Sequence, residues 1–306
     1  MPKFSFRPYQ GPTDLDIIVK IVSQRPKDRI VDYPNQVNLQ AMLGVPQPKE
    51  AVAIWFDESG QSVGFTLLDN FTLQLEILPP ESDYDLGQAM IDWAVPHLRD
   101  RKEANQSALN IRTNCRSTQT ERLTFLKRLG FIQETGFTWH YARSLAEPIA
   151  QPQVPPDFTI RALAGEAEVA EYVAVHRAAF DTQLMTVEDR VSRMATPNYI
   201  SELDLVAIAP NREIAAYVFG QIHQQDNALT GRKEGYTDPV GTHPDYRRRG
   251  LARSLLLTGL TLLKKHGMDT AKLGTWFNNT PMQRTAEVVG FRRVDRTLFF
   301  RKGIEK

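Results

Sequence analysis

The chain reads as two halves that repeat one order of apolar segments and turns, and this repeat constrains the fold more than any other feature of the sequence. The halves match at an offset of about 160 residues, in order and spacing, which exceeds any solenoid period and indicates duplicated domains. Four prolines fall between Leu145 and Asp157, where neither helical nor strand periodicity is present. We therefore expect a domain at 1–145, a proline-rich linker at 146–157 and a second domain at 158–306.

The same succession of strands and helices is expected in both halves. Each half opens with a short strand and an amphipathic helix, continues through a β-hairpin and a further strand into a helix, and closes with a strand, a helix and a strand. This succession predicts an α/β fold with two tandem domains, each a twisted mixed β-sheet flanked by helices. The elements expected in the first half are 4–8, 14–22, 51–56, 62–68, 72–78, 86–98 and 108–113. Their counterparts in the second half are 158–161, 166–180, 203–209, 214–222, 236–242, 251–265 and 271–276.

The composition narrows the class of protein. Of 306 residues, 42% are hydrophobic and 24% charged, as in soluble globular domains, and a formal net charge of +1 offers no bulk attraction to nucleic acid or an anionic membrane. The N-terminus lacks a signal-like apolar segment, and no apolar run is long enough for a membrane span. Cys115 is the single cysteine, which excludes an intramolecular disulfide and a cysteine-cluster metal site. We expect a cytoplasmic monomer or homodimer without a metal.

A basic, glycine-containing loop precedes the helix expected at 251–265. A helix N-terminus presents unpaired N–H groups and the positive end of the helix dipole, so a diphosphate can bind there. Small residues let the main chain approach the phosphate, and arginines add positive charge. A solvated surface loop, or one that binds nucleic-acid phosphates, is the alternative reading. The segment reads Val240-Gly241-Thr242-His243-Pro244-Asp245-Tyr246-Arg247-Arg248-Arg249-Gly250-Leu251-Ala252.

The pattern Arg247-x-x-Gly250-x-Ala252 resembles the pyrophosphate motif of the GCN5-related N-acetyltransferases (GNAT), and the element order from Phe158 to Phe300 is similar to that fold. The resemblance implies acetyl-CoA as cofactor, a primary amine as acceptor, and main-chain pairing of the motif strand with pantetheine. It also implies that Asn278 or Asn279 contacts pantetheine, although either asparagine could merely cap the next helix. The expected cofactor-binding residues are Val240, Gly241, Thr242, Arg247, Arg248, Arg249, Gly250, Leu251, Ala252, Asn278 and Asn279.

The resemblance also suggests where acyl transfer occurs. A backbone N–H near Thr242 is the expected oxyanion donor. Glu234 and Asp238 flank the strand on its substrate side and are the candidate bases, and both could equally be hairpin-loop charges. His243 lies in a His-Pro loop, where a structural hydrogen bond is the expected role.

The usual proton donor of the family is missing. Much of the family carries a tyrosine four residues before the Gly-Phe pair at which the last helix stops, here Gly290-Phe291, and that position is Ala286 in this chain. The thiolate therefore either leaves unaided or is protonated by Tyr236 or Tyr246. The sequence does not choose between these.

The first half departs further from the family. Where the second half has its arginine loop, residues 79–87 read PPESDYDLG, with three acids and no arginine. Acids suit a helix N-terminus but repel a diphosphate. We interpret the first half as a degenerate copy that does not bind CoA, a layout that resembles tandem acetyltransferases of the mycothiol synthase type.

Three classes of function remain in competition. The leading prediction is an N-acetyltransferase that acts on the primary amine of a small molecule, with a protein or peptide amine as the alternative acceptor. A non-catalytic acyl-CoA sensor is permitted by the missing tyrosine. A nucleic-acid binder built on the arginine loop is the least favoured. The sequence names neither the acceptor nor the preferred acyl chain length.

Overall fold

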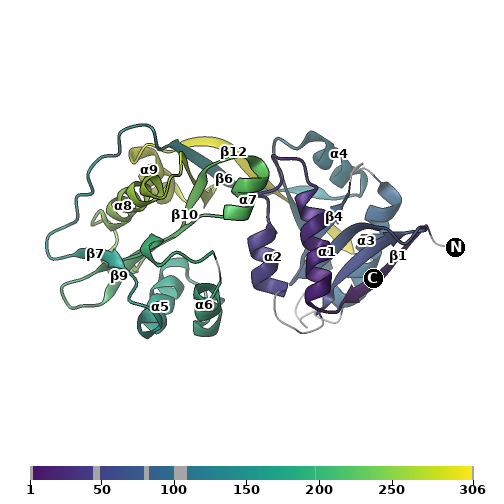
Figure 1. Cartoon of the computed structure of the whole chain (residues 1–306), viewed down its shortest axis with the longest axis horizontal. Coiled ribbons are helices and arrows are strands. Elements are labelled where there is room, and N and C mark those ends of the chain that lie inside the picture. The colour runs from purple at the N-terminus through teal and green to yellow at the C-terminus, as the bar shows by residue number, and fades with distance from the viewer. Residues whose placement is uncertain (1–2, 44–48, 79–82, 100–108, 197, 305–306) are drawn as a thin grey trace. The chain divides into compact units, whose positions relative to one another are not determined.

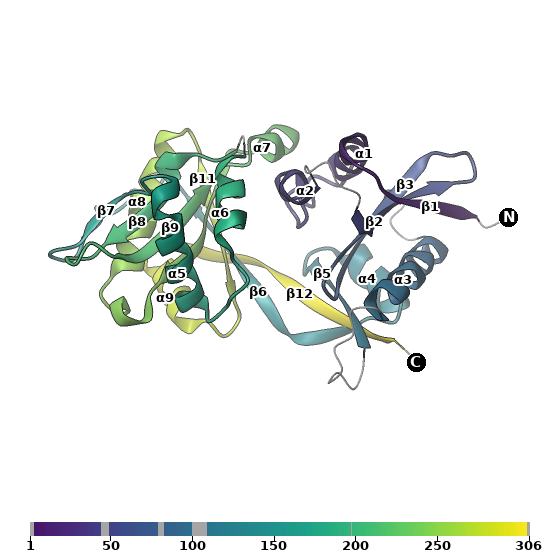
Figure 2. The same ribbon diagram turned by 90° about the horizontal axis from the view of Figure 1, so that it is seen from below.

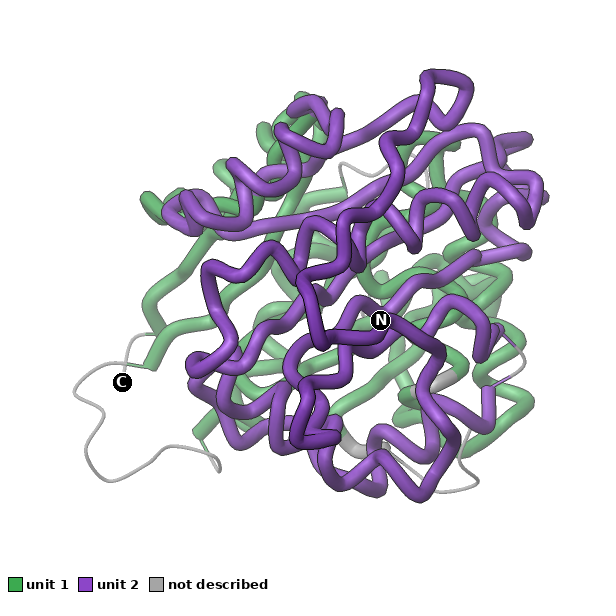
Figure 3. Tube along the Cα trace, turned by 90° about the vertical axis from the view of Figure 1, so that its left-hand side faces the viewer, with its two compact units in different colours: residues 1–138, 295–306 green, residues 139–294 purple. Residues whose placement is uncertain are grey.

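The structure, a computed structural model, describes residues 3–43, 49–78, 83–99, 109–196 and 198–304. The chain divides into two compact units (Figure 3). Unit 1 contains residues 1–138 together with 295–306, and unit 2 contains residues 139–294. Each unit is a mixed β-sheet with helices on both faces, so the predicted fold class is confirmed.

The units do not follow the domain boundaries expected at residues 145 and 158. The last strand of the chain, β12 (Arg292–Ile304), pairs antiparallel with β5 (Leu109–Arg116), and this pairing places 295–304 in the sheet of unit 1. Strand β6 (Ile132–Ser144) conversely contributes residues 139–144 to unit 2, where β6 lies next to β11 (Thr270–Trp276). Each half of the chain thus supplies the closing strand of the other half's sheet.

Unit 1 has the strand order β1-β2-β3-β4-β5-β12, in which β4 and β5 are parallel and the other recorded pairs are antiparallel. Helices α1 and α2 cover one face of the sheet, and α3 and α4 cover the other (Figure 2). Ile18, Leu39 and Phe65 are buried on the first face, and Met90 and Phe125 on the second. Its elements are β1 (Phe4–Tyr9), α1 (Pro12–Ser23), α2 (Gln36–Leu43), β2 (Lys49–Asp57), β3 (Ser62–Asp69), β4 (Thr72–Ile77), α3 (Tyr84–Arg99), β5 and α4 (Thr120–Arg128).

Unit 2 has the strand order β6-β11-β10-β9-β8-β7, in which β10 and β11 are parallel. Helices α8 and α9 lie on one face and α5 and α6 on the other (Figure 1). Its elements are β7 (Thr159–Ala162), α5 (Val169–Phe180), α6 (Val187–Met194), β8 (Asp204–Ile208), β9 (Ile214–Gln221), α7 (Gln224–Thr230), β10 (Glu234–Thr242), α8 (Leu251–Lys265), β11 and α9 (Thr280–Val288).

Helix α8 anchors the core of unit 2. Its apolar residues recur at helical spacing, so Leu255 and Leu260 are fully buried against the sheet, where Val218 and Leu273 meet them. Lysines in its last turn suit the negative end of the helix dipole. On the opposite face, α5 packs Tyr172 against Tyr217 of β9.

The sequence predicted the strands and the principal helices but not α2, α6 or α7. The expected linker has no regular structure from residue 148 to 155 and belongs to unit 2. The Ser254 hydroxyl donates to the Gln153 carbonyl oxygen at 2.6 Å, which ties the linker to α8. None of the helices in the described ranges has the length and apolar character that crossing a bilayer requires.

Candidate active site

A gap opens between the two parallel strands of unit 2. Strand β10 pairs with β11 from Glu234 opposite Thr270 to Tyr236 opposite Lys272, and their recorded register ends there. The pairing of β10 with β9 also shifts between Thr237 and Val240. Because the shift bends β10, the strands diverge beyond Tyr236.

Main-chain donors of β10 face this gap. The His243 N–H donates to the Ala215 carbonyl oxygen on β9 at 2.9 Å. Successive N–H groups of an extended strand point to opposite edges, so the N–H of Thr242, and that of Val240 before it, point toward β11. Gly241 lies between them, and a Cβ there would come within 2.4 Å of the Tyr217 ring. Only glycine fits this position.

The helix α8 begins with unpaired N–H groups. Gly250 is its N-cap in the left-handed conformation (φ 82°), and a Cβ built on it meets no atom within 4 Å. The N–H of Ser254 is the first to bond within the helix, to the Gly250 carbonyl oxygen, which leaves the three preceding N–H groups available. No acid occupies the first turn and no side chain caps it. This end of α8 suits an anion.

The three arginines of the loop lie in different surroundings. Arg247 donates to the Ala179 carbonyl oxygen at 3.0 Å and to that of Thr242 at 3.4 Å, so it braces the loop against α5 and β10. The Arg249 guanidinium lies over the Tyr246 ring, 5.6 Å from its centroid. Arg248 is exposed and has a left-handed backbone (φ 62°).

Asp238 bridges the two edges of the gap. Its Oδ2 accepts a hydrogen bond from the Gly274 N–H of β11 at 3.0 Å. Gly235 and Thr237 pack toward Leu263 and Gly259 of α8. Because side chains alternate along a strand, Asp238 emerges on the face of α5 and α6. Burial raises the pKa of Asp238 to about 6, against the opposing effect of the Gly274 hydrogen bond.

Glu234, the other candidate base, lies at the opposite end of β10 from Thr242. Eight residues of extended chain separate them, roughly 26 Å. The Glu234 carboxylate forms ion pairs with Lys272 at 3.3 Å and Arg232 at 3.9 Å. The structure therefore places Asp238, and not Glu234, beside the gap.

The remaining predicted residues have the following positions. Asn279 caps α9, since its Oδ1 accepts from the Met282 N–H at 3.2 Å, while Asn278 is exposed beside it. The hydroxyl of Tyr246 bonds to Glu213 at 3.0 Å. Ala286 is fully buried in the core, so its position faces no open site.

Two residues that the sequence reading missed lie next to this site. The Nδ1 atom of His223 is 3.4 Å from Oδ2 of Asp226, and the imidazole stacks on Tyr236 with the ring centroids 4.7 Å apart. The only local signal is the spacing His223-x-x-Asp226, which places both residues at one end of α7.

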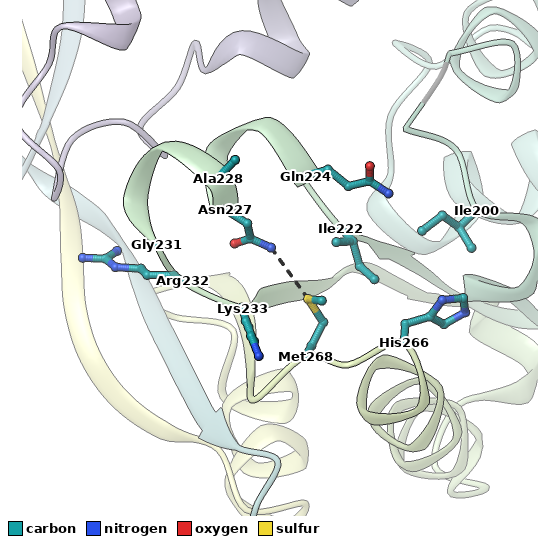
Figure 4. A pocket seen from close by; sticks show the side chains of 10 residues that line it. All are labelled: Ile200, Ile222, Gln224, Asn227, Ala228, Gly231, Arg232, Lys233, His266 and Met268. Atoms are coloured by element: carbon teal, nitrogen blue, oxygen red, sulfur yellow. Dashed lines mark hydrogen bonds between the residues drawn. The ribbon is translucent and has the colours of Figure 1, made fainter.

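Helix α7 also lines an open pocket of about 510 Å³ (Figure 4). Asn227 and Met268 meet there, with the Asn227 Nδ2 3.7 Å from the Met268 sulfur. The Arg232 and Lys233 side chains project away from its centre. Its lining residues are Ile200, Ile222, Gln224, Asn227, Ala228, Gly231, Arg232, Lys233, His266 and Met268.

A comparison with known protein families identifies the kind of domain that unit 2 contains. Residues 173–291 match the acetyltransferase (GNAT) family. The match covers the gap, the arginine loop and α8, so unit 2 contains a GNAT domain, the fold of acyl-CoA-dependent N-acyltransferases.

Relatives and solved structures extend the likeness to the whole chain. The chain is 26% identical to the mycothiol acetyltransferase of Nocardia farcinica, over 83% of this chain and 84% of that protein. It is also 26% identical to the mycothiol acetyltransferase of Thermobifida fusca, over 71% and 70%. A GCN5-related N-acetyltransferase from Sphaerobacter thermophilus superposes with a TM-score of 0.72 at 19% identity, over 100% of this chain and 97% of that one. A tandem GNAT protein from the clavulanic acid biosynthesis pathway also gives 0.72, at 16% identity and 99% coverage of both. The whole chain thus has the fold of these tandem proteins, and the family match itself covers residues 173–291.

Proposed function

We propose that the chain transfers an acetyl group from acetyl-CoA to the primary amine of a small molecule, and that unit 2 performs the reaction. The observation that carries the proposal is the divergence of β10 from β11 directly before an open helix N-terminus. The gap offers main-chain donors for pantetheine, and the helix start offers N–H groups for the diphosphate. The relatives named mycothiol acetyltransferases support acetyl transfer to a small molecule.

The proposal assigns acetyl-CoA to residues of the gap, the arginine loop and the first turn of α8. Val240, Gly241 and Thr242 line the gap with their main chain. Diphosphate binding falls to the loop and the first turn of α8, with Arg248 and Arg249 as the charged side chains and Arg247 as the residue that holds the loop. Asn278 is the remaining asparagine candidate, because Asn279 is engaged as a cap. The complete set is Val240, Gly241, Thr242, Arg247, Arg248, Arg249, Gly250, Leu251, Ala252 and Asn278.

The chemistry is a direct transfer. The amine nitrogen attacks the thioester carbon, the N–H of Thr242 or Val240 stabilises the oxyanion, and the C–S bond breaks. Of the two protons that the ammonium loses, one ends on sulfur and one reaches solvent. Asp238 is the proton acceptor of choice, because it lies at the gap and its raised pKa brings it close to neutral pH. Thiolate departs without a tyrosine on α9, since that position is Ala286.

Binding of acetyl-CoA is tested by thermal unfolding with a matched pair of variants. The Gly250→Glu variant places a carboxylate at the proposed diphosphate site. The Gly267→Glu variant is its control, because Gly267 has the same left-handed backbone (φ 81°) and open surroundings beyond the other end of α8. Acetyl-CoA at a hundred times its Kd should stabilise the native chain by about 2.7 kcal/mol. The shift should persist in Gly267→Glu and disappear in Gly250→Glu. Equal shifts in both variants would place the cofactor elsewhere.

Transfer is tested by following free thiol release from acetyl-CoA. Glucosamine, putrescine, tyramine and a tripeptide with a free N-terminus represent the classes of amine acceptor. Turnover of one of the first three supports a small-molecule enzyme, and turnover of the tripeptide alone would redirect the proposal to peptide acceptors. Binding of acetyl-CoA with no thiol release from any amine would favour the sensor.

A further inference from the structure

The imidazole of His176, on α5, lies close to the strand that carries the main-chain donors of the gap. Its Nδ1 atom is 2.5 Å from the Tyr217 hydroxyl oxygen. That oxygen is in turn 3.1 Å from the position that a Cβ on Gly241 would take. Gly241 separates Val240 from Thr242, whose N–H groups point into the gap. Two short contacts thus join the imidazole to the place proposed for the thioester.

Arg247 fixes the end of α5 to the same strand. Its guanidinium donates to the Ala179 carbonyl oxygen at 3.0 Å and to the Thr242 carbonyl oxygen at 3.4 Å. Ala179 lies on α5 within one turn of His176. The imidazole is therefore attached to β10 through its own ring and through the helix that carries it.

The other face of β10 is closed by α8. Val240 packs there against the apolar cluster that contains the leucines of α8, and a Cβ on Gly235 would come within 2.5 Å of the Leu263 side chain. Asp238, the proposed proton acceptor, emerges on the face of α5. The acceptor amine therefore approaches the gap from the face on which His176 lies.

The hydrogen bonds around Tyr217 determine which imidazole nitrogen carries the hydrogen. Burial raises the pKa of Tyr217 above its ordinary value, and a hydrogen bond from Tyr172 opposes this effect without cancelling it. The phenol therefore keeps its hydrogen at neutral pH. A buried hydroxyl needs an acceptor for that hydrogen, and the His176 Nδ1 is the one recorded for it in the described part of the chain. Burial also lowers the pKa of His176, so the neutral ring carries its own hydrogen on Nε2.

This Nε2–H group is available to a ligand. The imidazole is half-buried beside Phe180, with the ring centroids 4.8 Å apart. Within the described ranges Nε2 has no recorded hydrogen bond and is not one of the fully enclosed unpaired atoms, so it remains in contact with solvent. An N–H donor offers no lone pair to an ammonium ion, and donation to the free amine would occupy the lone pair that attacks the thioester. Its natural partner is an oxygen elsewhere in the acceptor.

We propose that the Nε2–H of His176 binds an oxygen of the acceptor close to the reacting amine, so that the acceptor is an amine with a hydroxyl or carbonyl oxygen on a neighbouring carbon. The inference rests on the function proposed for unit 2 and names the class of its acceptor. No bond to the imidazole forms or breaks, and Asp238 remains the proton acceptor. Of the four amines in the screen, glucosamine and the tripeptide belong to this class. Putrescine has no oxygen, and the tyramine oxygen lies across the ring from the amine.

The kinetic test measures kcat and KM for the four amines in the native chain, His176→Phe and His176→Gln. The native chain should prefer glucosamine or the tripeptide. His176→Phe should raise KM for the preferred amine about 10-fold with little change in kcat, because one hydrogen bond to the substrate is lost. His176→Gln should recover most of this loss, since its amide donates from a similar position and its carbonyl oxygen accepts from Tyr217.

The matched control is His266→Phe, because His266 lies at the end of α8 and pairs with Glu202 at 3.1 Å. Its KM values should equal those of the native chain. Thermal stabilisation by acetyl-CoA should be retained in all three variants, which separates a lost acceptor contact from a failure to fold. A native preference for putrescine or tyramine would overturn the inference, and so would an unchanged KM in folded His176→Phe.

A second measurement needs no acceptor. In protein labelled with ¹⁵N-histidine, NMR should place the hydrogen of neutral His176 on Nε2, and Tyr217→Phe should shift the tautomer population. A hydrogen on Nδ1 in the native chain would overturn the inference whatever the amine screen gives. A hydrogen on Nε2 in a protein that releases no thiol with any amine would locate the failure in the proposed function instead.

Discussion

Each unit carries a buried or partly buried carboxylate on the strand that precedes its crossover helix, and the two carboxylates have opposite surroundings. Glu76 of β4 accepts from Arg25 at 2.7 Å and 3.0 Å and from Arg29 at 2.9 Å, and all three side chains are at most 5% exposed. Asp238 of β10 has one recorded main-chain donor across the gap, the N–H of Gly274. One carboxylate is surrounded by guanidinium groups and the other is not.

The difference appears directly in proton affinity. Burial alone would raise the pKa of Glu76. The positive charges of Arg25, Arg29 and Arg122 together outweigh burial and lower the pKa to about 2. Burial dominates at Asp238 and raises its pKa to about 6. The same type of group on a related fold thus becomes a permanent anion in unit 1 and an exchangeable acid in unit 2.

The helices that follow these strands differ in the same way. In unit 1 the Asp83 carboxylate accepts from the Leu86 N–H at 3.2 Å and pairs with Lys3 at 3.1 Å, so α3 begins with its own anion. In unit 2, α8 begins with the uncapped Gly250. An anion already placed at α3 competes with any diphosphate, which supports the prediction that unit 1 is a degenerate copy.

The largest predicted effect on stability comes from removing the charge of Glu76. The Glu76→Gln variant should lower the free energy of unfolding by about 3 to 5 kcal/mol, because two buried guanidinium groups lose their shared carboxylate. Chemical denaturation measures this loss. Stabilisation of the remaining folded protein by acetyl-CoA should be retained, since the proposed cofactor residues all lie in unit 2.

Glu134→Gln serves as the control for this variant. Glu134 pairs with Arg112 at 3.8 Å in unit 1, where the Arg112 side chain is 62% exposed, so its loss should change stability by less than about 1 kcal/mol. Similar effects of the two substitutions would mean that Glu76 and its arginines do not act as a buried network, and the contrast with Asp238 would fail.

The pH dependence of stability should have opposite signs for the two carboxylates. The native pKa of Glu76 lies below its ordinary value of 4.5, so its stabilising contribution is complete above pH 4.5 and is lost as pH falls toward 2. The native pKa of Asp238 lies above its ordinary value of 3.8, so the native state binds the extra proton and stability rises as pH falls from 6 toward 4. Thermal unfolding of Glu76→Gln and Asp238→Asn across pH 3 to 7 measures both.

In practice the difference in Tm between native chain and variant should shrink on acidification for Glu76→Gln. For Asp238→Asn the native chain should gain relative to the variant between pH 6 and pH 4. A pH-independent difference for Asp238→Asn would mean that its carboxylate is as well solvated as in the unfolded chain. Asp238 would then lose its advantage as the proton acceptor.

The sequence was informative where the chemistry is local. The segment from Val240 to Ala252 is contiguous, so its strand, loop and helix start could be read directly, and the structure has them in that order. The fold class likewise followed from periodicity and turns. The prediction of Asn279 as a pantetheine contact competed with a capping role, and the structure records the cap.

The features that could not be predicted from the sequence are contacts between residues that lie far apart in the chain. Arg25 and Glu76 are 51 residues apart in the sequence, and the sequence around each of them gives no sign that they form an ion pair. Helix α7 reads QQDNALT, which has no apolar stripe, so neither the helix nor the placement of His223 on Tyr236 could be predicted. Strand β12 pairs with β5, and the sequence of neither strand by itself identifies the other as its partner.

The smallest predicted effect concerns the capped start of α3. Asp83→Ala should lower the free energy of unfolding by about 1 kcal/mol, because the Leu86 N–H loses its acceptor. Asp85→Ala is the matched control two residues further on, in the first turn of α3. The Asp85 side chain is 74% exposed and lies 3.9 Å from the Lys3 Nζ. The stability difference between the two variants therefore isolates the cap. Calorimetric titration with acetyl-CoA should give one site per chain in both variants. A second site in Asp83→Ala would mean that this single carboxylate, rather than the loss of the arginine loop, keeps unit 1 from binding the cofactor.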